Sequence, residues 1–87
     1  MKIVNDSLSI DRGFSRITEH GRWTSGEVAT HHGFVTVYAQ ENYSRLDFVH
    51  GGRLHMRRID VCYTPRGLAR AAHRFASEIA NNKSTSA

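Results

Sequence analysis

Residues 64–82, TPRGLARAAHRFASEIANN, predict one long helix. Thr64 can serve as the N-cap, and Pro65 brings the preset φ of a first helical residue, where a missing N–H costs nothing. Apolar residues then recur at helical spacing, at Leu68, Ala72, Phe75 and Ile79. This spacing places them on one face of the helix, so that face needs a cover.

The chain before this helix is typical of a small antiparallel sheet. Its clearest strand is residues 34–40, FVTVYAQ, which are rich in β-branched and aromatic side chains. Residues 43–50 are expected to form the next strand, and residues 51–52 are a Gly-Gly hairpin signal. Shorter strands are expected at residues 14–20 and 27–30. The predicted fold class is α+β: a twisted antiparallel sheet of about four strands with the helix packed across one face.

The side chains that must face the core predict the register of the last hairpin. A two-residue loop would place Leu46 opposite Arg57, which mixes apolar and polar residues on one face. We therefore expect a three-residue loop, residues 51–53, which pairs Phe48 with Met56. This register turns Met56 toward the core.

The expected core combines residues of the last two strands and the helix. Its members are Leu46, Phe48, Met56, Val61, Leu68, Ala72, Phe75 and Ile79. Beyond Met56 the apolar residues of the last strand change parity, since Ile59 is an odd number of positions away. Such a change predicts a β-bulge at Arg57 and Arg58.

Length and composition indicate one small domain, residues 1–87, with a polar tail at 82–87 that is expected to fray. The amino terminus lacks the apolar run of a signal peptide, and no stretch approaches the about 18 apolar residues of a membrane span. The single cysteine, Cys62, excludes an internal disulfide. We expect a cytoplasmic protein, a monomer or weak dimer, without membrane contact.

The residue spacings of known catalytic and metal sites are missing. Six histidines include the adjacent His31 and His32, but no C-x-x-C or H-E-x-x-H spacing completes a zinc site. Cys62 lies between two apolar residues of a strand, a poor location for a nucleophile. Asp47 and Asp60 each have an arginine neighbour, which explains them as ion-pair partners. We expect no enzymatic activity, no catalytic residue, no metal and no cofactor.

Positive charge is concentrated in the second half of the chain. Residues 1–49 have a net charge of −1, whereas residues 50–87 have +5. A row of like charges costs a helix about a few tenths of a kcal/mol per pair, so it suggests a polyanionic or acidic partner. The expected partner-binding residues are Arg66, Arg70 and Arg74 in one helical row, with Arg53, Arg57 and Arg58 from the last hairpin. An ordinary solvated face is the alternative, as is arginine enrichment from a GC-rich genome.

A three-stranded antiparallel meander followed by a helix that begins TPRGLARAAHRF resembles the integrase amino-terminal arm-binding domain and its plant transcription-factor relatives. The likeness covers residues 34–80. It implies a sheet that enters the DNA major groove while the helix braces its back, with Arg45, Arg53 and Arg57 among the residues that contact DNA. The acidic strand residue Asp47 and the positive charge on the helix depart from that pattern.

The size and expected architecture also resemble small phage-encoded anti-CRISPR proteins. This resemblance implies a stoichiometric inhibitor of a host protein or ribonucleoprotein complex such as a Cas effector, with contact to a nucleic-acid backbone as one route. It transfers no residues, because no motif supports it. A small basic ribonuclease toxin is a third alternative, but its acid–base set cannot be assembled here. We expect a non-enzymatic binding protein of the inhibitor type, with the DNA-binding module as the alternative.

Overall fold

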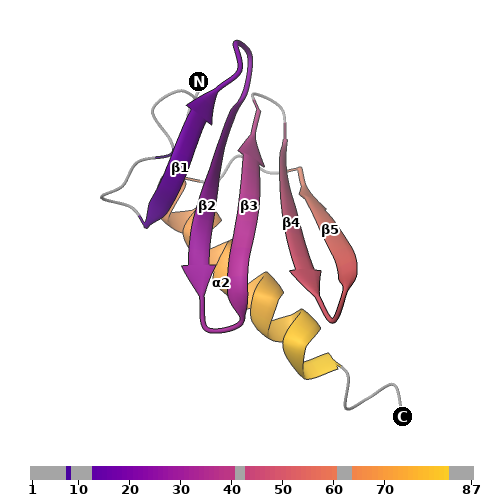
Figure 1. Cartoon of the computed structure of the whole chain (residues 1–87). Coiled ribbons are helices and arrows are strands. Elements are labelled where there is room, and N and C mark those ends of the chain that lie inside the picture. The colour runs from indigo at the N-terminus through magenta and orange to yellow at the C-terminus, as the bar shows by residue number, and fades with distance from the viewer. Residues whose placement is uncertain (1–7, 9–12, 41–42, 61–63, 83–87) are drawn as a thin grey trace.

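The computed structural model describes residue 8 and residues 13–40, 43–60 and 64–82. Five strands form one antiparallel sheet in the order β1-β2-β3-β4-β5, and a helix, α2, crosses one face of it (Figure 1). The bounds are β1 Phe14–Glu19, β2 Thr24–Thr30, β3 Gly33–Ala39, β4 Ser44–His50, β5 Arg53–Ile59 and α2 Pro65–Asn82. The α+β class is confirmed, with five strands where about four were expected.

The helix begins where the sequence predicts. The backbone N–H of Gly67 donates to Thr64 Oγ1 at 3.1 Å, and that of Leu68 donates to the Thr64 carbonyl at 2.8 Å. Thr64 therefore caps the helix and satisfies N–H groups that a helix start leaves unpaired. Within the described part of the chain, no helix has both the length and the apolar character needed to cross a membrane.

The core lies between α2 and the sheet face that it covers, which we call the inner face. The helix packs most closely against β2, β3 and β4. The buried side chains of these strands and of α2 include Val28, Val35, Val37, Leu46, Phe48, Leu68, Ala72, Phe75 and Ala76. Phe48 meets Phe75 edge-on, with ring centroids 6.3 Å apart. The expected core positions on α2 and β4 are thus confirmed, with Ile79 partly buried, while Val61 lies outside the described residues.

The β4–β5 hairpin has a different register from the expected one. Its loop is the two residues Gly51 and Gly52, with φ of 62° and 75°. Positive φ at both positions suits a type I′ turn, whose twist matches the flanking strands, and glycine adopts it without strain. Phe48 consequently pairs with His55 and not with Met56. The three-residue loop was a wrong prediction because the turn, and not the facing of β5, decides the register.

Strand β5 can place polar residues on the inner face because it is an edge strand to which α2 packs less closely. Arg57 and His55 lie on that face, and Ile59 is the one buried residue of β5. Met56 points to the opposite, outer face and is 60% exposed, so its predicted place in the core was wrong. All seven residues of β5 pair with β4 in unbroken register, so the bulge predicted at Arg57 and Arg58 was also wrong.

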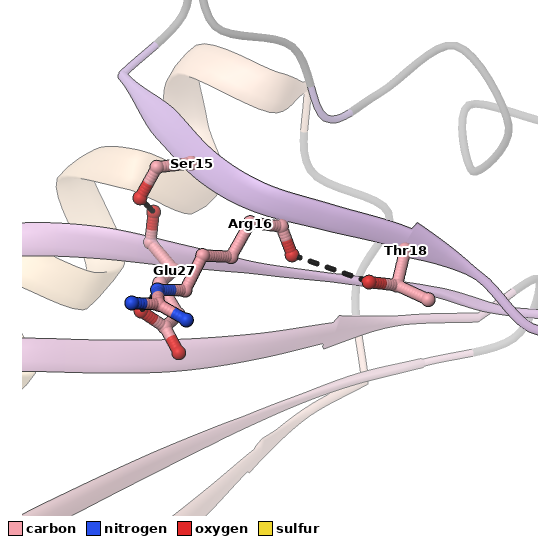
Figure 2. Close-up of polar contacts among 4 residues, drawn as sticks. All are labelled: Ser15, Arg16, Thr18 and Glu27. Atoms are coloured by element: carbon pink, nitrogen blue, oxygen red, sulfur yellow. Dashed lines mark hydrogen bonds and ion pairs between the residues drawn. The ribbon is translucent and has the colours of Figure 1, made fainter.

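A bulge lies in β1 instead. The pairing of β1 with β2 shifts register between Ser15 and Thr18, and Arg16 within this stretch adopts a left-handed φ of 51°. Figure 2 shows the local contacts: the Thr18 hydroxyl donates to the Arg16 carbonyl at 3.4 Å, and Arg16 Nε lies 3.5 Å from Glu27 Oε1. Phe14 and Ile17 both pack on the core, although strict alternation would place them on opposite faces.

Truncation of Leu46 and of Met56 tests whether the β4–β5 hairpin has the two-residue loop or the three-residue loop. Leu46→Ala should lower the free energy of unfolding by about 2–5 kcal/mol, because it leaves a cavity in the core. Met56→Ala, on the exposed face, should change it by less than about 0.5 kcal/mol. Urea denaturation followed by Trp23 fluorescence measures both. A loss above about 2 kcal/mol for Met56→Ala would contradict the two-residue loop.

The N-cap is tested by removal of one hydroxyl. Thr64→Ala should cost about 1 kcal/mol of unfolding free energy, because the Gly67 N–H loses its acceptor. Thr64→Ser keeps the hydroxyl and should stay within about 0.5 kcal/mol of the parent. Thermal or urea unfolding of the two variants provides the comparison. Equal losses would mean that the hydroxyl does not cap the helix.

Candidate functional site

Three of the six arginines expected to bind a partner surround one groove. Arg57 reaches it from the inner face of β5, and Arg70 and Arg74 from successive turns of α2. We call these three the groove arginines. The groove has a volume of about 300 Å³, and its lining is completed by Ile59, Gly67 and Ala71. It lies beside β5 because α2 crosses the sheet diagonally and packs on the central strands (Figure 1).

The side chain of Arg57 is held by two contacts with the helix. Its guanidinium carbon lies 4.8 Å from the centre of the Phe75 ring, and its Nη2 lies 2.7 Å from Glu78 Oε1. The guanidinium thus lies over the edge of the core in a cation–π contact and also reaches a carboxylate of the helix. The sequence places Glu78 one turn after Arg74, yet the structure pairs it with Arg57 across the two elements.

The groove has an excess of positive charge. Among the described residues, Arg70 and Arg74 have no ion-pair partner. In the same described part of the chain, the carboxylate of Glu78 pairs with Arg57 alone, so the three groove arginines and Glu78 together have a net charge of +2. Like charges that line one groove repel one another, and a bound anion would offset that repulsion.

The other three expected arginines lie elsewhere. Arg58 is on the outer face, with its guanidinium carbon 4.2 Å from the centre of the Tyr43 ring and its Nε paired with Asp60. Arg53 begins β5 beside the turn, and Arg66 lies in the first turn of α2. Both are exposed, and neither lines the groove. The structure thus divides the expected set into a group of three and three separate residues.

Comparison with known proteins leaves this groove to be interpreted from its own residues. The chain matches no protein-family model, no curated protein and no solved structure. Guanidinium groups bind carboxylates and phosphates through two parallel hydrogen bonds, so the groove is suited to an anion with several such groups. The side chains of Ile59 and Ala71 in the lining add apolar contact beside the charges.

The outer face of the sheet exposes an apolar patch that the sequence analysis did not find. We define the outer apolar patch as Phe34, Val49, Leu54 and Met56, each at least 53% exposed. Val49 and Leu54 are cross-strand partners, and Phe34 lies one position beyond the Val35–Phe48 pair, which places it beside Val49. Alternation along β5 could have revealed the patch, but the wrong register had turned Met56 to the other face.

The structure also brings His20 and Ser25 together, a contact that no sequence motif indicates. His20 Nε2 lies 3.1 Å from Ser25 Oγ, and the His20 ring stacks on Trp23 with centroids 3.8 Å apart. A nucleophilic serine needs a histidine that a third group orients, and no carboxylate bonds to His20 within the described residues. In the same residues, no three His, Cys, Asp or Glu side chains gather closely enough to hold a metal ion.

Removal of the Glu78 carboxylate should strengthen anion binding in the groove, because that carboxylate competes for Arg57. Glu78→Gln should therefore elute from a heparin column at higher salt than the parent. Its free energy of unfolding should fall by less than about 1 kcal/mol, since the Arg57–Glu78 pair is exposed. Glu19→Gln makes the same charge change on β1 and should shift elution less. Equal shifts would show that heparin responds to net charge alone.

Proposed function

We propose that this protein is a non-enzymatic binding protein that inhibits a nucleic-acid-handling complex of a host cell by occupying an acidic surface of one of its proteins. The observation that supports this proposal is the convergence of the groove arginines, from two separate elements, around one groove with a net charge of +2. Such an arrangement favours a partner with several carboxylates, because each guanidinium can hold one of them bidentately.

Complexes that cut or copy nucleic acids offer acidic surfaces of this kind. Their active sites bring carboxylates together to hold Mg²⁺ or similar ions. A small basic protein that covers such a surface blocks access without any chemistry of its own. A Cas effector is the member of this class that we propose to test first, because the chain resembles anti-CRISPR proteins in size and α+β architecture.

The charges of the outer face favour a protein partner over duplex DNA. A sheet that enters the major groove needs free cations on its exposed face, since protein–DNA interfaces are strongly positive. Arg45 is instead engaged with Asp47, with Nε 3.0 Å from Oδ1 and Nη2 3.2 Å from Oδ2. Arg58 is paired with Asp60. The same face exposes the outer apolar patch, which suits a protein surface better than a DNA groove.

Measurements of binding to DNA and to a Cas effector should distinguish an inhibitor of a protein complex from a DNA-binding module. In fluorescence anisotropy at physiological salt, labelled duplex and single-stranded DNA should bind with a Kd weaker than about 10 μM. The protein should bind a purified Cas effector and reduce the binding or cleavage of its target DNA. Sub-micromolar DNA binding at physiological salt, or no inhibition of any effector in a panel, would refute the proposal.

Two single substitutions on the same helix test the groove itself. Arg70→Glu should weaken inhibition by about tenfold or more, because it places a carboxylate among the groove arginines. Arg66→Glu makes the same charge change one turn earlier, outside the groove, and should change inhibition by less than about twofold. Circular dichroism checks that both variants are folded. Equal effects of the two substitutions would exclude the groove as the binding site.

A further inference from the structure

We propose that the partner of the groove binds through an extended segment that adds to β5 as a sixth strand. In this segment acidic residues alternate with apolar ones. The inference rests on the proposed function, because it names the form in which the partner presents its carboxylates to the groove arginines. It draws on three features of β5: its free edge, the outer apolar patch and the groove.

Strand β5 has backbone groups available for a further strand. It ends the sheet and, among the described strands, pairs with β4 alone. In a two-residue hairpin the residues that flank the loop, His50 and Arg53, form a hydrogen-bonded pair, and such pairs then alternate along the strands. The N–H and C=O groups of Leu54, Met56 and Arg58 therefore point away from β4. Edge groups of this kind are a template for strand addition.

The opposite edge of the sheet is less suited to a new strand. Strand β1 has its bulge at Arg16, and the Arg16 carbonyl already accepts a hydrogen bond from Thr18 (Figure 2). Bulges of this kind prevent regular pairing at an edge. Strand β5 has no bulge and no proline, and all seven of its residues are in regular register with β4. Regular pairing on its free side therefore meets no obstacle within the strand.

The outer apolar patch determines which residues of the added strand should be apolar. Residues opposite one another in a sheet point to the same face, so the residues facing Leu54 and Met56 would lie on the outer face. There they would meet the exposed side chains of Leu54 and Met56 at the border of the patch. Apolar residues at these positions would remove that surface from water.

The groove determines which residues of the added strand should be acidic. The residues facing His55 and Arg57 would point to the inner face, where Arg57 shares the groove with Arg70 and Arg74. Carboxylates at these positions would come within reach of guanidinium groups from both β5 and α2. A single extended segment can therefore use both surfaces if apolar and acidic residues alternate with the period of two that a strand imposes.

A second copy of this chain fits the β5 edge poorly. Strand β5 contains Arg53, Arg57 and Arg58 and no carboxylate. Pairing of β5 with the β5 of another copy would bring two such sets of three guanidinium groups into adjacent strands. Like charges on neighbouring strands destabilise the pair, whereas an acidic strand would neutralise them.

Two peptides of identical composition test the strand addition. We would measure by anisotropy the binding of fluorescein-labelled VEVEVEVEV and of VVEEVVEEV, which has the same charge without the period of two. The alternating peptide should bind about tenfold more tightly or better. In NMR hydrogen exchange, the amides of Leu54, Met56 and Arg58 should exchange more slowly once it is bound, because they acquire acceptors.

Protein variants test the edge and the groove separately. Met56→Pro removes an outward N–H without removing a bond to β4, and should weaken the alternating peptide about tenfold. If this variant is unfolded, Met56→Gln serves in its place, because it removes the apolar contact without a change of charge or a break in the backbone. The double variant Arg70→Glu, Arg74→Glu should lose affinity for VEVEVEVEV and gain affinity for VKVKVKVKV.

The outcomes distinguish this inference from the proposed function. Equal affinity for the two glutamate peptides, or no binding of either, would refute strand addition, while effector inhibition through the groove would stand on its own test. Slow exchange of the Leu54, Met56 and Arg58 amides in the free protein, with a dimeric mass in solution, would assign the edge to a second copy. Tight duplex binding would refute the proposed function itself.

Discussion

The contact between the apolar stripe of α2 and the inner face of β2, β3 and β4 is the constraint on which the rest of the structure depends. Leu68, Ala72 and Phe75 are buried there against valine, leucine and phenylalanine side chains of the sheet. An α-helix with its side chains is about 10–12 Å wide, whereas five strands spaced by about 4.8 Å extend over about 19 Å. One helix therefore packs most closely on the central strands and less closely on the two edge strands.

This mismatch of widths explains the position of the groove. At this margin of the sheet the inner face of β5 has Arg57, whose guanidinium lies over the Phe75 ring, and Ile59, which is buried at the end of the strand. Because α2 crosses the sheet diagonally, the helical row with Arg70 and Arg74 borders the same margin. The arginines there repel one another and lower the stability of the helix, and an anionic partner would offset this repulsion.

The two edges of the sheet differ in a way that bears on assembly. Strand β1 is interrupted by the bulge at Arg16, so that both Phe14 and Ile17 pack on the core. Strand β5 is regular, and the protection it has against pairing with its own copies is the charge of its arginines. Charge of one sign excludes like strands but attracts an acidic one, so the same residues provide both protection and specificity.

Local sequence was sufficient for the helix with its Thr64 cap, for its buried stripe, for the α+β class and for the positive charge of the second half, because these depend on neighbours a few residues apart. Four features were decided by tertiary structure: the outward facing of Met56, the bulge at Arg16, the partner of Glu78 and the grouping of three arginines. A slip of one residue in strand register moves every side chain to the other face of the sheet. The Gly51-Gly52 turn sets the register of β5, although the apolar residues of that strand suggest a different one. The groove, in turn, depends on the angle at which one helix crosses five strands, which no local pattern encodes.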